Sequence, residues 1–245
     1  MLSHVRLMMR ADARKTLLPA LVATVIACGF DSEDAVAESA GQRPTLLYGE
    51  NISFDIFRGG SKIGTHTVNF TESHGRLTVT AATRLRIAFL FIPAYRFDYW
   101  ARETWIDGNL AEVAAETDDN GKKSRVEAIA TGGKLEIKGP RGERAIDGWI
   151  FPTNHWNIEQ VASDRVLNSI TGQIDHVAVR PREPEAIATP HGRIFAERFE
   201  YTGDLHDTHV WYDRAGRWVK MSFKARDGSW IEYRCTSCRA DQTKG

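Results

Sequence analysis

Apolar and polar residues alternate along most of the chain after Leu46, a pattern that predicts β-strands. The clearest run extends from Leu77 to Ile87, where arginine and threonine residues stand between mostly apolar ones. Successive side chains of a strand point to opposite faces. One face of this strand is therefore expected in the core, and the other is expected to meet solvent or a ligand.

Short turn sequences such as Gly59-Gly60, Gly132-Gly133 and Asp227-Gly228 separate the alternating runs. Connections this short join antiparallel strands, because a parallel crossover needs about a dozen residues or more. We therefore predict a mainly β fold, an antiparallel and strongly curved sheet or half-barrel of about ten or eleven strands. A βαβ nucleotide-binding fold is not expected.

One stretch interrupts the β pattern. From Ile158 to Gly172, apolar residues recur near the 3.6-residue period of an amphipathic helix. Asn157 is placed to cap the start of this helix, although Asn154 is a rival, and Gly172 is a natural end. We predict one amphipathic helix, from Trp156 to Thr171, packed into the concavity of the sheet.

Alternation fails between Phe89 and Ile92, where consecutive residues are apolar and a proline follows. A solvated hairpin loop normally carries Gly, Asn or Asp instead. Either this loop folds over the domain as part of the core, or it forms an apolar lip that meets a lipid, a membrane surface or a protein. The candidate ligand-binding residues are Phe89 and Phe91 here and Tyr95, Phe97 and Tyr99 in the aromatic run that follows. Such a run is also typical of a packed sheet.

His155, Trp156 and Asn157 form a second candidate ligand-binding group at the start of the predicted helix. Backbone N–H groups and the positive end of the helix dipole gather there, and His155 could titrate near neutral pH. Two interpretations stay open. Trp156 anchors the helix, Asn157 caps it and His155 satisfies a backbone group, or the three residues line a ligand pocket between helix and sheet.

Motifs for catalysis and metal binding do not emerge. The sequence contains no GxSxG motif, no GxGxxG and no P-loop. Asp204, His206, Asp207 and His209 resemble metal ligands, but the two histidines would point to opposite faces of a strand. Carboxylates of the sheet could meet, yet no pattern selects a pair. The candidates are Glu50, Asp98, Glu103 and Glu232. We therefore expect no catalytic residues, no metal and no cofactor.

An N-terminal leader precedes the β pattern. Its basic residues are Arg6, Arg10, Arg14 and Lys15, and the apolar segment from Leu17 to Ala27 follows them. This pattern is typical of an export signal and is too short for a membrane span of about 20 residues. Cleavage after Ala35-Val36-Ala37 would release a soluble periplasmic protein. Alternatively, Val25 to Cys28 resembles a lipobox, in which case the leader ends at residue 27 and Cys28 carries a lipid anchor. Cys28 can also be a small apolar residue within the signal.

The full chain has 245 residues with 32 basic and 32 acidic side chains, a balance that does not suggest a nucleic-acid partner. Neither repeats nor linkers divide the part after the leader. We expect an export signal over residues 1–37, a flexible linker over 38–45, one β domain over 46–240 and a tail over 241–245.

Cys235 and Cys238 form a CxxC motif near the end of the chain. No second CxxC or histidine pair accompanies it, and it follows a strand pattern rather than opening a helix. In an oxidising compartment a disulfide is the leading interpretation, with free thiols and a metal or redox role as alternatives.

Several segments resemble a proteobacterial family of exported proteins of unknown function. They are Thr153 to Asn157, Leu167 to Gly172, Tyr201 to Leu205, Val210 to Asp213, Gly216 to Lys220 and Ala225 to Ser229. The resemblance covers most of the chain after Leu46 and implies no activity. More distantly, the predicted fold is similar to the half-barrel of Lol-type lipoprotein carriers, which hold acyl chains between a curved sheet and helices.

These observations favour a non-enzymatic cell-envelope protein that binds an apolar or lipid-like ligand between helix and sheet. A structural module that contacts another envelope protein is one alternative. A hydrolase or isomerase that uses His155 with a carboxylate of the sheet is another.

Overall fold

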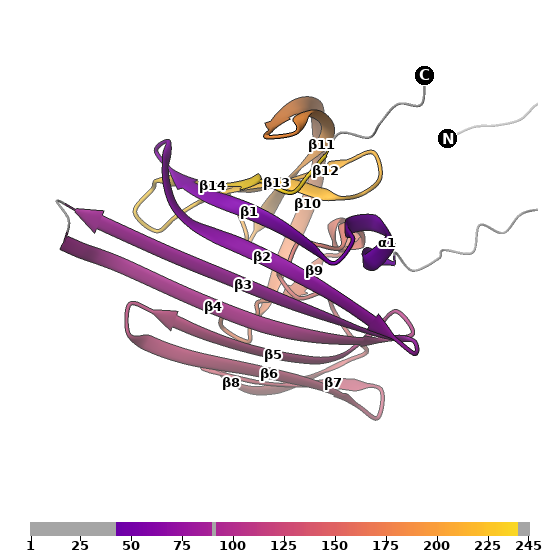
Figure 1. Ribbon diagram of the computed structural model, residues 1–245. Coiled ribbons are helices and arrows are strands. Elements are labelled where there is room, and N and C mark those ends of the chain that lie inside the picture. Colours follow the sequence, from indigo (N-terminus) through magenta and orange to yellow (C-terminus); the bar gives the residue numbers. More distant parts are fainter. Residues whose placement is uncertain (1–42, 90–91, 240–245) are drawn as a thin grey trace, which may run out of the picture. The chain divides into compact units, whose positions relative to one another are not determined.

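Fourteen strands form one antiparallel sheet in the computed structural model, which describes residues 43–89 and 92–239 (Figure 1). The elements are α1 Pro44–Tyr48, β1 Asn51–Arg58, β2 Ser61–Ser73, β3 Arg76–Phe89, β4 Ile92–Ile106, β5 Asn109–Asp119, β6 Lys122–Thr131, β7 Lys134–Gly139, β8 Gly142–Asp147, the 3-10 helix η1 Ile158–Ala162, β9 Arg165–Leu167, β10 Ile174–Thr189, β11 Gly192–Gly203, β12 Thr208–Asp213, β13 Trp218–Lys224 and β14 Trp230–Cys235. The predicted export signal with Cys28, the first part of the predicted linker and the predicted tail lie outside the described residues.

The strand order runs from β8 down to β1 and continues with β14 down to β9. The first and last strands of the chain are therefore neighbours, with Phe54 of β1 opposite Cys235 of β14. β8 and β9 are the two edge strands of this unclosed, curved sheet. This arrangement confirms the predicted mainly β half-barrel, although the predicted number of strands was too low.

The predicted helix from Trp156 to Thr171 is wrong. Only η1 forms there, and it ends at Ala162, because the backbone of the next residue, Ser163, is extended. Asn157 caps the start as predicted, because its side-chain oxygen accepts a hydrogen bond from a backbone N–H of η1 at 2.9 Å. Val166, a β-branched residue, then joins β9 and pairs with β10. The same apolar residues that fit a helical period are thus divided between a short helical turn and an edge strand.

The core lies on the concave face of the sheet. On β4, Tyr99, Ala101 and Trp105 point inward and are buried, whereas Trp100 and Arg102 between them point outward and are exposed. This alternation matches the period of a strand that has one face covered.

Candidate functional site in the concave face

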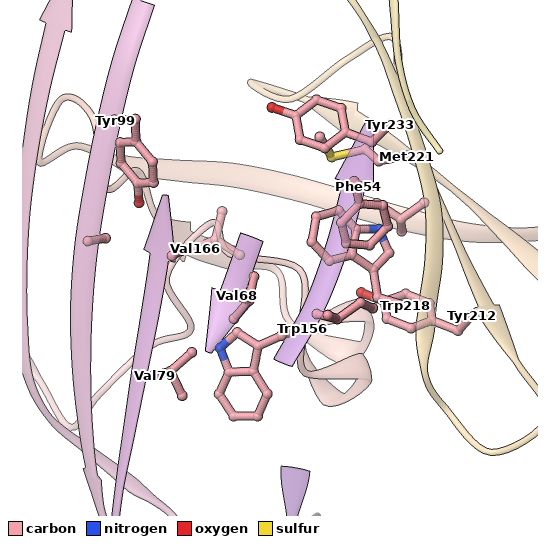
Figure 2. Packing of buried hydrophobic residues seen from close by; sticks show 14 of the residues in the cluster. Phe54, Val68, Val79, Tyr99, Trp156, Val166, Tyr212, Trp218, Met221 and Tyr233 are labelled. Carbon is pink, nitrogen blue, oxygen red and sulfur yellow. The ribbon is translucent and has the colours of Figure 1, made fainter. Parts of the chain in front are cut away.

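The chain crosses the concave face of the sheet between the edge strands β8 and β9. This crossing segment, residues 148–164, is bonded to β9. The N–H of Leu167 donates to the carbonyl of Phe151 at 2.8 Å, and the N–H of Thr153 donates to the carbonyl of Leu167 at 3.0 Å. Figure 2 shows Trp156 among inward-facing residues such as Val68. The crossing segment therefore occupies the concavity where the sequence predicted a helix.

Aromatic rings pack the crossing segment against the sheet. The ring of Trp105 on β4 lies 5.4 Å from Trp149, 5.6 Å from Trp156 and 5.8 Å from Phe151, between ring centroids. Phe70 of β2 lies 5.8 Å from Trp156. All of these contacts except that of Trp105 with Phe151 are edge-to-face, a geometry that stabilises aromatic pairs beyond simple burial. Trp156 thus packs as an anchor, which was one of its two interpretations.

A buried carboxylate binds the crossing segment to β4. Glu103 is fully buried, and its oxygens accept hydrogen bonds from the indole N–H of Trp105 at 2.9 Å, the indole N–H of Trp156 at 3.0 Å and the side-chain amide of Asn154. Burial raises the pKa of Glu103, and the three donors oppose that rise. Every partner is a donor, an arrangement that suits an ionised carboxylate held as a structural clamp.

The hydroxyl of Tyr99 continues this polar network. It donates to the amide oxygen of Asn154 at 3.0 Å and shares a hydrogen bond of 2.7 Å with the hydroxyl of Ser169. Ser169 in turn lies 3.2 Å from the hydroxyl of Thr153. Burial raises the pKa of Tyr99, so its hydroxyl keeps its proton. Tyr99, a predicted ligand-binding residue, is therefore already satisfied by protein groups.

Four other buried polar residues lie on the inward side of the sheet, and we call them the histidine cluster: His66, His155, Gln160 and Tyr201. His66 lies 5.5 Å and His155 5.9 Å from the Trp218 ring, while His155 lies 5.7 Å from Tyr201. Each of the four has a buried polar atom without a hydrogen-bond partner in the described structure. This group differs from the Glu103 network, whose polar atoms are paired.

The two histidines of this cluster are held neutral. Burial lowers the pKa of His155 to about 4. Burial, together with the neighbouring His155, lowers the pKa of His66 to about 3. A buried imidazolium would lack solvation here, which explains both shifts.

One end of the concave face carries apolar residues that are only half-buried. This apolar end consists of Leu85 and Ile87 on β3, Tyr95 and Phe97 on β4, and Phe223 on β13. β3 and β4 extend beyond their neighbours there, because β2 pairs with β3 only as far as Leu85 and β5 pairs with β4 only from Phe97 (Figure 1). Burial and a hydrogen bond with Asp119 raise the pKa of Tyr95 to about 12.

The convex face has a groove of about 810 Å³ that opens to solvent. It runs across β2 to β6, and Trp100, 38% exposed, lies in it. Its charged lining includes Arg84, Asp98, Glu116 and Arg125. Ion pairs link these groups, such as Arg125 with Glu116 at 3.2 Å. This convex groove is on the opposite face from the histidine cluster and the Glu103 network.

The sequence matches the model of a family described as a domain of unknown function, DUF6134, over residues 54–236. The chain belongs to this family. Among solved structures, this DUF6134 protein is similar to a β-barrel-like protein of the domain of unknown function DUF1849 from Brucella abortus. The TM-score is 0.55 at 13% identity, over 76% of this chain and 94% of that chain. This likeness is one of fold. A search of curated proteins found no match.

The predicted ligand-binding residues of this DUF6134 protein fall into separate places. Tyr95 and Phe97 lie at the apolar end, whereas Asn157 caps η1. The side chain of Phe89 and all of Phe91 lie outside the described residues. The structure brings His155 together with residues that the sequence did not single out, above all His66 and Tyr201.

Glu103 had a sequence signal of its own. It stands in the same phase of β4 as Phe97, Tyr99 and Trp105, so the alternation already placed a carboxylate on the apolar face. Two other candidate carboxylates of the DUF6134 domain, Asp98 and Glu232, form ion pairs elsewhere and do not contact Glu103. Asp98 points outward and binds Arg86 at 2.7 Å, and Glu232 lies 3.3 Å from Lys220.

Cys235 and Cys238 form a disulfide with their Cα atoms 5.6 Å apart, the leading interpretation of the CxxC motif. The described residues contain no group of three or more His, Cys, Asp or Glu side chains placed to hold a metal ion. Neither helix in the described part of the chain has the length and apolar character needed to span a membrane.

Proposed function

We propose that the protein is a non-enzymatic binding protein of the cell envelope that holds an apolar or lipid-like molecule on the concave face of its half-barrel. The apolar end carries this proposal. Leu85, Ile87 and Phe97 belong to the inward face, yet they remain only half-buried. Covering apolar surface contributes about 25 cal/mol per Å² to binding, so an apolar ligand gains free energy there.

Two further observations support this proposal. The charge and length pattern of the leader favours export to the periplasm, where the protein would be soluble or anchored through Cys28. A curved sheet with chain crossing its concavity also resembles the Lol-type carriers in outline, an analogy of fold alone. The crossing segment would take the place of the helices of those carriers.

A binding experiment with delipidated protein tests the proposal. We expect a fluorescent fatty acid such as cis-parinaric acid to bind, and we expect Ile87→Asp to weaken that binding at least about tenfold, because a carboxylate on the inward face opposes apolar contact. The control is Ala88→Asp, one residue further along β3 and exposed, which should bind like the wild type. Absence of binding by the wild type, to this probe and to envelope lipid extracts, would overturn the proposal.

The convex groove favours a second candidate function, an interaction module of the envelope. Trp100 is an exposed aromatic residue in a hollow lined by charges, a combination that recurs in protein interfaces. Trp100→Asp should then abolish the capture of one stoichiometric envelope protein. Ile129→Asp, which alters another exposed apolar residue, should leave it intact. Equal capture by both variants would contradict this function.

The hydrolase or isomerase alternative requires His155 within hydrogen-bond reach of a carboxylate. Glu103 is a fully buried carboxylate on the inward face of β4, and it accepts hydrogen bonds from Trp105, Asn154 and Trp156 instead. The geometry of the described residues therefore gives this alternative no support.

A further inference from the structure

The convex groove is lined by two neighbouring rows of outward-facing residues that cross the sheet from β2 to β6 (Figure 1). Each row consists of residues that stand directly opposite one another on paired strands. The first row is Thr67, Ala82, Trp100, Glu116 and Arg125. The second row, two residues away on every strand, is Thr65, Arg84, Asp98, Asp118 and Lys123. With about 4.8 Å between strands, each row is about 19 Å long. The groove is therefore an extended track across five strands.

Trp100 stands in the middle of the first row, and its ring is free. Its exposed fraction is 38%, and none of the described residues places a ring or a cation against its indole or accepts a hydrogen bond from its indole N–H. Trp211, by contrast, is covered by the ammonium group of Lys220 at 4.4 Å. The next residues along the row, Ala82 and Thr67, have short side chains that leave room beside the indole. An aromatic face of this kind can stack against a flat apolar surface.

The charged groups of the groove balance one another. Three basic and three acidic side chains line it. Ion pairs join Arg84 to Asp98 at 3.5 Å and Arg125 to Glu116 at 3.2 Å. A ligand with a net charge would therefore meet a repulsive group beside each attractive one. Paired donors and acceptors instead suit hydroxyl groups, because every hydroxyl both donates and accepts hydrogen bonds.

These features together match a carbohydrate. A pyranose with equatorial hydroxyls has an apolar face of C–H groups, which stacks on an exposed indole, and a rim of hydroxyls, which reaches polar side chains. Thr65 and Thr67 offer further hydroxyls that have no partner among the described residues. The volume of about 810 Å³ lies within the range of about 300–1,000 Å³ that is typical of ligand sites. The length of the rows suits a short chain of sugars rather than a single ring.

We infer that the convex groove binds an uncharged oligosaccharide of β-linked pyranoses, with one ring stacked on Trp100 and its hydroxyls bonded to the polar side chains of the two rows. A β-linked chain is extended, as the rows are. This inference goes beyond the proposed function, because it concerns the opposite face of the sheet and a different class of ligand.

The same groove carries the second candidate function, in which its occupant is a protein. Protein interfaces bury a core of several apolar residues around an aromatic anchor. Beside Trp100, the two rows contain one other apolar side chain, that of Ala82. The lining of the groove therefore favours an oligosaccharide over a protein partner.

Isothermal titration calorimetry with cellotetraose, chitotetraose and maltotetraose tests this inference. We expect the wild type to bind the first two at least about tenfold more tightly than maltotetraose, whose α-linkages curve the chain. Trp100→Ala should lose about tenfold in affinity for the β-linked compounds, because it removes the stacking surface. Ile129→Ala alters an exposed apolar residue outside the groove and should bind like the wild type.

A second pair of variants leaves Trp100 in place. Ala82→Ile fills the space beside the indole and should weaken binding at least about tenfold. Isoleucine is favourable in a strand, so the fold should survive, which circular dichroism checks. The matched control is Ala114→Ile on β5, which lies outside the groove and should leave binding unchanged.

Salt gives a readout that needs no variant. Raising NaCl from about 50 to about 500 mM should alter the affinity by less than about twofold, because an uncharged ligand leaves no net attraction to screen. A loss of affinity with salt of tenfold or more would contradict an uncharged ligand.

Three results would overturn the inference: no binding of the β-linked compounds by the wild type, equal binding of maltotetraose, or undiminished binding by Trp100→Ala and Ala82→Ile. Capture of an envelope protein through Trp100 without oligosaccharide binding would also overturn it and would favour the second candidate function. Trp100→Ala should bind cis-parinaric acid like the wild type, so the proposed function is tested separately.

Discussion

Two kinds of buried polar residue share the concave face, and they differ in whether the protein itself satisfies them. Glu103 accepts from three donors, two of which belong to the crossing segment. His66 and His155 keep one nitrogen each without a partner. A satisfied buried network stabilises the fold, whereas unpaired atoms reduce stability. The Glu103 network therefore stabilises the fold, whereas the unpaired nitrogens of His66 and His155 lower its stability.

Replacing Glu103 by leucine should lower the stability of the folded protein. Glu103→Leu leaves Trp105, Asn154 and Trp156 with buried donors that lack an acceptor, and the free energy of unfolding should fall by about 3–5 kcal/mol. Glu103→Gln keeps one acceptor oxygen and should cost less. Urea unfolding measures both. Glu112→Leu, at a partly exposed ion pair with Arg102, is the control and should change stability by less than about 1 kcal/mol. Equal stability of Glu103→Leu and the wild type would contradict the clamp.

The buried histidines should make the protein less stable in acid. In the folded state their pKa values are about 3 and about 4, below the ordinary 6.5 of the unfolded chain. The unfolded state therefore binds more protons below pH 6.5, so stability is full above that pH and falls as the pH drops toward 4. Each histidine should contribute a loss of about 2–3 kcal/mol between pH 6.5 and 4.5. Urea unfolding across this range should show a shallower dependence for His155→Phe, and an unchanged slope in that variant would argue against a neutral buried imidazole.

At the scale of elements, the turn between β11 and β12 shows how closely the chain passes itself beside the histidine cluster. Gly203 has a positive φ of 83°, and a Cβ atom placed there would lie 2.3 Å from the backbone carbonyl oxygen of His176 at the start of β10. Tyr201 of the histidine cluster is two residues away. This close approach therefore fixes the end of β11 against the start of β10.

Alanine substitutions at Gly203 and Gly133 distinguish two causes of instability, a steric clash of the new side chain and the strain of a left-handed backbone. Gly203→Ala should destabilise the protein by several kcal/mol, because the new methyl group collides with rigid backbone in addition to the left-handed conformation. Gly133→Ala is the matched control: its φ is 78°, and nothing lies within 4 Å of the added Cβ, so it should cost only about 1–2 kcal/mol. Thermal unfolding compares the two. If both variants lose the same stability, the backbone between β10 and β11 moves to accommodate the methyl group, and the expected clash at Gly203 is wrong.

The elements also show what could be predicted from sequence and what could not. Alternation and short turns are local signals, and they correctly predicted an antiparallel half-barrel. The helix was wrong because Ile158, Val161 and Val166 fit a helical period, while the β-branched Val166 gained more from pairing at the sheet edge. His155 was recognised from its neighbours. Its partnership with His66 was not, because it depends on the pairing of β1 with β14, a contact between the two ends of the domain.

At the scale of the whole molecule, α1 is hydrogen-bonded to two distant parts of the described domain. Tyr48 at the end of α1 donates to the backbone carbonyl of Trp156 at 2.6 Å and accepts from the backbone N–H of Trp218 at 2.9 Å. The N-terminal part of the domain thus secures both the crossing segment and β13. Both predicted cleavage positions precede Tyr48 in the sequence, so neither would remove the residues that make these contacts.

The two processing routes predict different mature proteins. We expect cleavage after Ala37, which gives a soluble periplasmic protein that begins at Glu38, and a soluble carrier can move an apolar ligand between membranes. Mass spectrometry of the mature N-terminus and fractionation of cells should show this product, and Cys28→Ala should change neither result. Ala37→Leu should block cleavage, because such sites require small residues. Incorporation of labelled palmitate that disappears in Cys28→Ala would contradict the soluble route. It would instead indicate a protein that is anchored to a membrane through Cys28.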